Sequence, residues 1–257
     1  MDWVRDFYTR TGRWWGDAEG QVGERDHRRV TLLHRYVGEA PARVLELGAG
    51  YGTTALAAAR AGHDVTAVEI SDRADRAAGL PEAAGPGTLT VVKDDFYRVR
   101  LSGRFPAVCY WNGFGVGSDA DQRRLLRRVA TEWLAPGGTA LVDVMNPFVW
   151  ARWDGDEEEK PARPDDGYPY AVSNRTVFDP VTCVAVDTWW ESGSPDQRIS
   201  QYLRCYTPAD LMLLLEGTGL RLDRLVVGEE ETSVVPRPGS TALLREHDEY
   251  LAVLRHG

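Results

Sequence analysis

The sequence predicts an α/β fold, in which helices cover both faces of a mostly parallel sheet. Strand-like apolar runs alternate with helical stretches up to Met145, which is the pattern of β-α-β units. A turn with glycine at every second position, 48–52, joins one such strand to the helix that follows it. A Pro-Gly-Gly turn at 136–138 leads into a further strand. These three observations indicate a single wound sheet.

The run Val44 to Gly52, which reads V-L-E-L-G-A-G-Y-G, is the most informative segment of the chain. It predicts a short buried strand, a glycine turn and then a helix over 53–60. Glycine is needed where a ligand lies against the backbone and where φ is positive. The N–H groups at the start of the next helix face the crevice beyond the strand. The turn therefore predicts a nucleotide-like cofactor.

The spacing of the glycines distinguishes two classes of cofactor. Dinucleotide enzymes prefer G-x-G-x-x-G, whereas this turn has G-x-G-x-G, with Thr53 next and the acidic Glu46 two residues before the first glycine. The pattern resembles motif I of the class I S-adenosylmethionine-dependent methyltransferases. That resemblance implies S-adenosylmethionine as the cofactor, with Glu46 close to its ammonium group.

Two later strands support an adenosine-containing ligand. The stretch 63–70 alternates apolar residues like a buried strand, and Glu69 stands about 20 residues beyond the turn, where an acid accepts hydrogen bonds from ribose hydroxyls. NAD enzymes share this feature. The stretch 89–96 reads as a third strand that ends in Asp95 and Phe96. In the methyltransferases that it resembles, the acid reaches the adenine amino group and the apolar side chain packs on the ring.

A fourth segment, 133–144, reads as a helix end, the Pro-Gly-Gly turn and a fifth strand. A Pro-Gly-Gly turn before this strand is commoner in methyltransferases than in dehydrogenases. The resemblance to the methyltransferases covers residues 27–146. The cofactor-binding residues that we expect are Trp15, Glu46, Gly48, Ala49, Gly50, Glu69, Ile70, Asp95, Phe96 and Trp111.

Small-molecule methyltransferases that act on amines, including the amino-sugar N-methyltransferases of antibiotic pathways, are similar in layout. They carry an antiparallel insertion after the fifth strand and an aromatic N-terminal segment. The resemblance implies a Rossmann-like, seven-stranded, mostly parallel sheet with that insertion and an N-terminal helical lid. The Ala-, Arg- and Gly-rich composition is a hint of bacterial secondary metabolism. We expect one domain over 1–257, with four parts: a lid at 1–25, a cofactor-binding core at 27–146, a loop and antiparallel insertion at 147–206, and a last helix and strands at 207–257.

Within the insertion, the stretch Asp154 to Asp166 is acidic and contains proline, which predicts a surface loop. A flap over the site is the alternative. The remaining elements that the pattern predicts are strands at 174–178, 181–191 and 198–205, a helix capped by Thr207, and strands at 220–228 and 250–254.

The N-terminal segment is rich in aromatic residues, which favour a sulfonium cation near their faces. Trp3 and Phe7 lie four residues apart, so an amphipathic helix that packs on the sheet accounts for them as well as a lid does. Tyr8, Trp14 and Trp15 are expected to face the ligand, because two neighbouring tryptophans are not expected to point into one core.

The segment Tyr110 to Gly117 is expected to be a loop after the fourth strand, where cofactor and acceptor meet. Asn112 offers both a donor and an acceptor, and we expect Tyr8 and Asn112 to be the catalytic residues. A flexible linker with a buried Trp111 is the alternative. The loop has no histidine (Val116 stands near the position where some relatives place one).

A general base is not evident elsewhere in the sequence. The five histidines favour structural or surface positions. Possible acceptor-binding groups near strand ends are Asp143, Asn146, Arg175 and Tyr206, although structural roles are favoured for each. A neutral amine attacks through its lone pair, whereas an alcohol needs a base, so this pattern favours N-methylation over O-methylation. A carboxylate acceptor needs no base either.

The net charge of −9 disfavours a nucleic-acid substrate. The three cysteines have no metal-ligand spacing, and no secretory or membrane-spanning segment is evident, so we expect a cytoplasmic enzyme without a metal. Its expected partner is a small-molecule acceptor, and a homodimer is possible. Two alternatives stay open: a non-methylating S-adenosylmethionine-binding protein or cyclase on the same fold, and an NAD(P)-dependent reductase.

Overall fold

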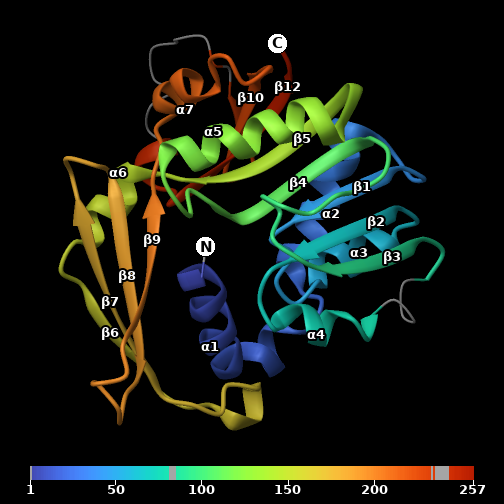
Figure 1. The fold of residues 1–257 in the computed structure, drawn as a ribbon. Helices are drawn as coiled ribbons and strands as arrows, with labels where there is room; N and C mark the ends of the chain where they lie inside the picture. Colours follow the sequence, from blue (N-terminus) through green and yellow to red (C-terminus); the bar gives the residue numbers. More distant parts are fainter. Residues whose placement is uncertain (1, 81–84, 233, 235–242) are drawn as a thin grey trace. The chain divides into compact units, whose positions relative to one another are not determined.

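The computed structural model describes residues 2–80, 85–232, 234 and 243–257 (Figure 1). The chain divides into two compact units. The first comprises the chain up to Arg100 together with Glu157–Arg175 and Asp187–Gln201. The second comprises Leu101–Asp156, Thr176–Val186 and Tyr202–Gly257. The expectation of one domain with four parts stays a prediction.

Three parallel strands form the sheet of the first unit: β1 (Arg43–Leu47), β2 (Asp64–Glu69) and β3 (Thr88–Lys93). Their apolar residues are buried, as the alternating pattern predicts. Because neighbouring parallel strands run in the same direction, their carboxyl ends meet at one edge. The glycine turn after β1, the acidic end of β2 and the segment after β3 therefore come together there.

The helices of this unit are α1 (Asp2–Glu19), α2 (Glu24–Val37), α3 (Thr53–Arg60) and α4 (Arg73–Ala77). The alanine-rich α3 packs on β2, β3 and α2, since small side chains allow close approach. Gly52 comes just before α3, with φ of 75°, and a Cβ there would lie 3.0 Å from the Cβ of Ala77. The third glycine of the turn is therefore required by the packing of α4.

The aromatic face of α1 packs against residues of the antiparallel strands. Phe7 and Trp14 are buried with Val172 and Ile199 in one apolar cluster, against which Tyr8, Trp15 and Trp189 pack. The indole of Trp14 donates to Glu191 Oε1 at 2.9 Å. The expectation that Trp14 faces the ligand is wrong. The apolar face of the helix is wide enough for both neighbouring tryptophans to join the same cluster.

The insertion contains four antiparallel strands in sheet order: β6 (Glu157–Lys160), β7 (Val172–Asp179), β8 (Val184–Glu191) and β9 (Ile199–Arg204). The last three are the strands expected from the sequence. The expectation of a plain surface loop at 154–166 is wrong, because β6 lies inside it and pairs with β7. All four residues of β6 are exposed, so it carries no apolar alternation from which a strand could be predicted.

The second unit holds five strands in the order β11-β10-β12-β5-β4. Their bounds are β4 (Phe105–Phe114), β5 (Leu134–Met145), β10 (Leu220–Val227), β11 (Glu230–Thr232) and β12 (Glu249–His256). Strands β4 and β5 are parallel, and β12 runs antiparallel to both β5 and β10. The predicted α/β fold with mostly parallel strands is therefore confirmed. The short β11 was not expected.

Two capped helices flank these strands: α5 (Asp119–Arg128), which a π-helical turn extends to Trp133, and α7 (Pro208–Leu215). Ser118 and Thr207 cap them, and the cap at Thr207 is the one predicted above. The remaining short helices are α6 (Pro147–Trp150) and the single turns Ala151–Trp153, Pro164–Asp166 and Leu243–Arg245. In the described part of the chain, no helix is long and apolar enough to cross a membrane.

Gly115, just after β4, lies in close contact with the backbone of Arg204 in the second unit. Its φ is 108°, its carbonyl accepts from the N–H of Arg204 at 2.9 Å, and a Cβ there would lie 2.3 Å from the Arg204 carbonyl oxygen. We expect Gly115→Ala to destabilise the protein by more than the about 1–2 kcal/mol of a left-handed alanine. Thermal unfolding measures the loss as a lowered Tm.

Gly137→Ala is the matched control, because Gly137 has φ of 76° but no described atom lies within 4 Å of the position that its Cβ would take. This control should show the conformational cost alone. Equal losses in Tm for the two variants would contradict the close approach of Gly115 to Arg204.

Candidate functional site

The glycine turn at the end of β1 has the geometry that a bound ligand requires. Gly48 and Gly50 have φ of 61° and 56°. The N–H of Ala49 donates to the Val68 carbonyl at 3.0 Å, which fastens the turn to β2. A Cβ on Gly50 would meet no described atom within 4 Å, so the space beside the turn is open there. A cofactor can therefore lie directly against this backbone, which fits the expected S-adenosylmethionine.

Glu69, the last residue of β2, holds the turn from the other side. The side chain is buried, and its Oε2 accepts from the N–H of Gly50 at 2.8 Å. Its Oε1 accepts from the N–H of Ser71, also at 2.8 Å. A carboxylate has about four acceptor positions, so it can still receive ribose hydroxyls while it makes these two bonds. Glu69 thus combines a structural bond with the expected cofactor role.

The ends of β2 and β3 add three half-buried residues at the same edge: Ile70, Asp95 and Phe96. Asp95 Oδ1 accepts from the N–H of Tyr97 at 2.8 Å, which shapes the turn after β3. The ring centroids of Phe96 and Tyr97 lie 4.8 Å apart. The structure therefore brings the expected acid and the expected aromatic residue to the edge that holds the glycine turn.

Glu46 lies in β1 among buried polar groups. Burial raises the pKa of Glu46 to about 8, the charge of Asp26 adds to this rise and the charge of Arg29 opposes it. Asp26 Oδ1 accepts from the hydroxyls of Thr53 and Thr54, at 3.1 and 2.6 Å. Asp26 and Arg29 were not expected from the sequence. They lie on α2, far from the motif along the chain, and carry no spacing signal of their own.

Arg73, on α4, connects the N-terminal helix to the glycine turn. Its Nε donates to the Tyr8 carbonyl at 3.0 Å, and its Nη2 donates to Thr11 Oγ1 at 2.9 Å. Its guanidinium also lies over the rings of Tyr8 and Tyr51, 5.1 and 4.8 Å from their centroids. The hydroxyl of Tyr51 donates to the Gly12 carbonyl at 2.8 Å. These contacts hold α1 beside the turn, and sequence reasoning missed Arg73.

Tyr8, an expected catalytic residue, is half-buried on α1. Its hydroxyl donates to Gln201 Oε1 at 3.3 Å. Burial raises the pKa of Tyr8 to about 12, with Arg73 opposing the rise and Glu69 and Asp187 adding to it. The phenol therefore stays protonated at neutral pH. It can donate and accept hydrogen bonds, but it is unsuited to act as a base.

Trp15, an expected cofactor-binding residue, is half-buried against β8. Its ring meets Trp189 edge-on, with centroids 4.9 Å apart, and it meets Trp14 at 5.9 Å. This packing places Trp15 in the apolar cluster of α1. A contact with the cofactor stays a prediction.

Trp111 and Asn112 belong to the second unit. The expectation of a loop at 110–117 is partly wrong, because β4 continues to Phe114, with a shift of register against β5 between Tyr110 and Phe114. Trp111 is buried, whereas Asn112 is exposed and has φ of 51°. Its N–H donates to Asp143 Oδ2 at 3.2 Å. A non-glycine residue in this conformation is a strained feature of the kind that gathers at functional sites.

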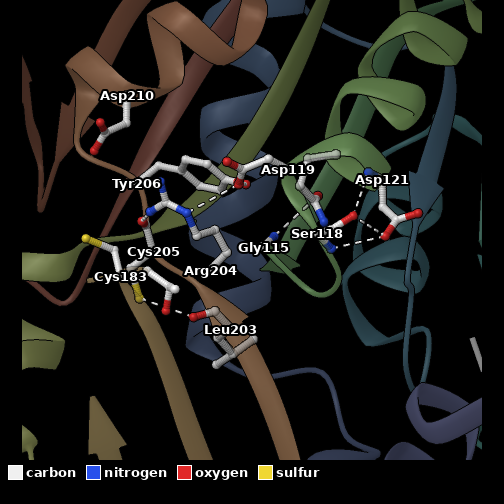
Figure 2. A network of polar contacts seen from close by, with 12 residues as sticks. Gly115, Ser118, Asp119, Asp121, Cys183, Leu203, Arg204, Cys205, Tyr206 and Asp210 are labelled. Atoms are coloured by element: carbon white, nitrogen blue, oxygen red, sulfur yellow. Dashed lines mark hydrogen bonds and ion pairs between the residues drawn. The ribbon is translucent and has the colours of Figure 1, made fainter. Parts of the chain in front are cut away.

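The other groups considered for acceptor binding have structural partners. Tyr206 is buried, and its hydroxyl donates to Asp119 Oδ1 at 2.7 Å, while Arg204 lies over its ring and pairs with Asp119 at 3.2 Å (Figure 2). Asn146 caps α6 and donates to the His247 carbonyl at 2.8 Å. Arg175 is exposed on β7.

A family model described as a methyltransferase domain matches residues 22–225. No curated protein sequence matches the chain.

Solved structures share the fold over most of the chain. The CcbJ methyltransferase from Streptomyces caelestis is 23% identical with a TM-score of 0.71, and the match covers 99% of this chain and 96% of that one. An S-adenosylmethionine-dependent methyltransferase from Clostridium acetobutylicum is 10% identical with a TM-score of 0.70, covering 98% and 99%. CalS10, an amino pentose methyltransferase from Micromonospora echinaspora, is 16% identical with a TM-score of 0.59, covering 90% of each chain.

The structures that share this fold include N-methyltransferases and an O-methyltransferase. The fold alone therefore leaves the acceptor atom open.

Glu69→Gln is expected to weaken S-adenosylmethionine binding about ten- to hundredfold, from about 1.5–3 kcal/mol for hydrogen bonds to a charged group. The amide would turn an N–H toward the N–H of Gly50 or Ser71 and loosen the turn. Isothermal titration calorimetry measures the affinity. Asp64→Asn is the control, because Asp64 lies at the opposite end of β2 and is exposed. Equal affinities of the Glu69 variant and the control would show that Glu69 does not hold the ligand.

Glu46 predicts a pH dependence of stability. Its pKa rises from an ordinary value near 4.5 to about 8 on folding, so the folded chain binds the proton more tightly than the unfolded chain does. The contribution of Glu46 is therefore present at low pH and is lost as pH rises through about 8. We expect the free energy of unfolding of the wild type to fall relative to Glu46→Gln between pH 5 and pH 8. A difference that stays constant in chemical denaturation over this range would show that Glu46 is ionised throughout.

Proposed function

The chain belongs to the methyltransferase domain family and is an S-adenosylmethionine-dependent methyltransferase for a small molecule; we propose that it methylates an amine nitrogen. The observation that carries the proposal is the state of Tyr8. Its hydroxyl donates its proton to Gln201 Oε1 and burial raises its pKa to about 12, so the phenol is not a base for an alcohol. His34 and His63 contact each other at the amino end of β2, away from the turn. An amine needs no base before it attacks.

When bound, S-adenosylmethionine supplies a methyl group that passes to the amine lone pair, while the electron pair of the broken carbon–sulfur bond stays on sulfur. The chain contributes alignment, which is worth about 7–11 kcal/mol in good intramolecular models. In this proposal Gly48, Ala49 and Gly50 support the cofactor through the backbone. Glu46 and Glu69 hold its ammonium and its ribose.

The other residues of the proposed site act on the adenine ring and on the acceptor. Asp95 and Phe96 would meet adenine, with Ile70 beside it. Tyr8 and Asn112 would orient the acceptor, since the hydroxyl oxygen of Tyr8 keeps acceptor capacity while it donates to Gln201. The cofactor-binding roles of Trp15 and of Trp111 stay predictions from the sequence.

Amine specificity is also consistent with the amino pentose methyltransferase among the similar structures. We therefore propose an acceptor of bacterial secondary metabolism that carries an amine. A homodimer, a cytoplasmic location and the lack of a nucleic-acid partner stay predictions from the sequence.

The test of the proposed function is turnover on a panel of small amines, phenols and carboxylic acids, with S-adenosylhomocysteine and methylated product followed by mass spectrometry. We expect product with amines, and we expect it to disappear in Glu69→Ala. Methylation of phenols alone would contradict the assignment to nitrogen, and binding of S-adenosylmethionine without turnover on any class would favour a non-methylating member of the fold.

Tyr8→Phe and Asn112→Ala separate the two acceptor-orienting residues in the same assay. Each is expected to raise KM for the acceptor at least severalfold, because one hydrogen bond is worth about 0.5–1.5 kcal/mol. The affinity for S-adenosylmethionine should stay unchanged. An unaltered acceptor KM in both variants would remove these residues from the acceptor site.

A further inference from the structure

A buried carboxylate in the first unit lies outside every motif of the cofactor site. Asp187, on β8, is 5% exposed. Its Oδ2 accepts from the indole of Trp189 at 2.6 Å and from Gln201 Nε2, on β9, at 2.8 Å. A third donor is the side chain of Asn174, on β7. Residues from three neighbouring strands thus converge on one carboxylate, which we call the Asp187 cluster (Asn174, Asp187, Trp189 and Gln201).

The Asp187 cluster is linked to the cofactor turn through Tyr8. The phenol donates to Gln201 Oε1 at 3.3 Å, and both Asp187 and Glu69 raise its pKa. Tyr8 therefore lies within electrostatic reach of the ribose-binding acid on one side and of Asp187 on the other. An acceptor held at the cluster is close to the residue expected to orient it.

The cluster has one acceptor that is not satisfied. Asn174 Oδ1 is buried and has no hydrogen-bond partner among the described residues. The orientation of the amide is fixed, because its N–H₂ group must face Asp187, and the flipped form would place two oxygens against each other. A buried acceptor without a partner costs about 1–3 kcal/mol. A donor supplied by a ligand would remove that cost.

Asp187 also lacks a cation in direct contact. Its three hydrogen bonds come from neutral groups, and no described side chain forms an ion pair with it. Lys160 acts on it only from a distance, since its Nζ lies over the Trp189 ring, 5.0 Å from the centroid, and pairs with Glu158 at 3.6 Å. A desolvated carboxylate beside an unsatisfied carbonyl suits a group that brings both positive charge and N–H donors.

We propose that Asp187 and Asn174 form the binding site for the amino group of the methyl acceptor, an inference that rests on the proposed amine specificity. The ammonium donates to the Asp187 carboxylate and to Asn174 Oδ1. Burial raises the pKa of Asp187, which favours transfer of one proton from the ammonium to the carboxylate. That transfer leaves a neutral amine with its lone pair and a protonated Asp187.

The helix α1 packs beside the Asp187 cluster. Tyr8 and Trp15 pack with Trp189 in the apolar cluster of that helix, and Arg10 Nη2 donates to the Gln197 carbonyl at 2.9 Å. These contacts place α1 beside the strands that carry the cluster.

The experiment compares the binding of cyclohexylamine with that of cyclohexanol, by calorimetry, to protein saturated with S-adenosylhomocysteine. We expect the wild type to bind the amine at least tenfold more tightly than the alcohol. Asp187→Asn should remove this preference. Asn174→Ala should reduce it, because the ammonium loses the Oδ1 acceptor, and should also lower the Tm, because Asp187 loses the hydrogen bond that Asn174 donates.

Thr188→Ala is the matched control. The hydroxyl of Thr188 forms a hydrogen bond with the hydroxyl of Ser200 at 2.8 Å. Each of the two residues is next to a cluster residue in the chain, so its side chain lies on the opposite face of the strand. This variant should keep the full preference for the amine. A wild type that binds both compounds equally, or a preference that survives in Asp187→Asn, would overturn the proposal.

Turnover distinguishes a failure of this inference from a failure of the proposed function. Unchanged acceptor KM for N-methylation in Asp187→Asn would overturn the amine site while leaving the amine specificity intact. If no amine is methylated by the wild type, the proposed function fails, and the calorimetric preference still reports whether the cluster binds an ammonium.

Discussion

The carboxylate of Glu69 fixes the edge of the sheet on which the proposed chemistry depends. Gly50 and Ser71 lie in segments where the backbone N–H has no regular partner, and Glu69 accepts from both at 2.8 Å. The two bonds set the distance between the glycine turn and the start of α4. Arg73 follows two residues after Ser71, so the same carboxylate also sets the point from which α1 is held.

Two acids of the first unit, Glu46 and Asp187, are buried, and desolvation disfavours the charged form of each. Burial raises the pKa of Glu46 and of Asp187. A sulfonium cofactor with an ammonium group and an amine acceptor both bring positive charge. Buried acids become good partners when a cation arrives, since ion pairing then offsets the desolvation that burial has already imposed.

Local segments could be predicted from the sequence, whereas long-range clusters could not. The turn at Gly48–Gly52, Glu69 and the segment at Asp95 follow from short motifs and strand alternation. Tyr8 and Gln201 are 193 residues apart, and only the pairing of strands with α1 brings them together. The wrong expectation for Trp14 has the same origin, because the burial of Trp14 depends on strands distant in the sequence that pack against α1.

The attachment of α1 uses main-chain oxygens. Arg73 Nε binds the carbonyl of Tyr8, and the Tyr51 hydroxyl binds the carbonyl of Gly12. Main-chain groups are present whatever side chain occupies a position, so these two bonds persist when residues 8 and 15 are exchanged. The attachment of α1 therefore does not depend on the side chains that select the acceptor. Directed evolution can alter which molecules are accepted through residues 8 and 15 while the anchorage of the helix remains in place.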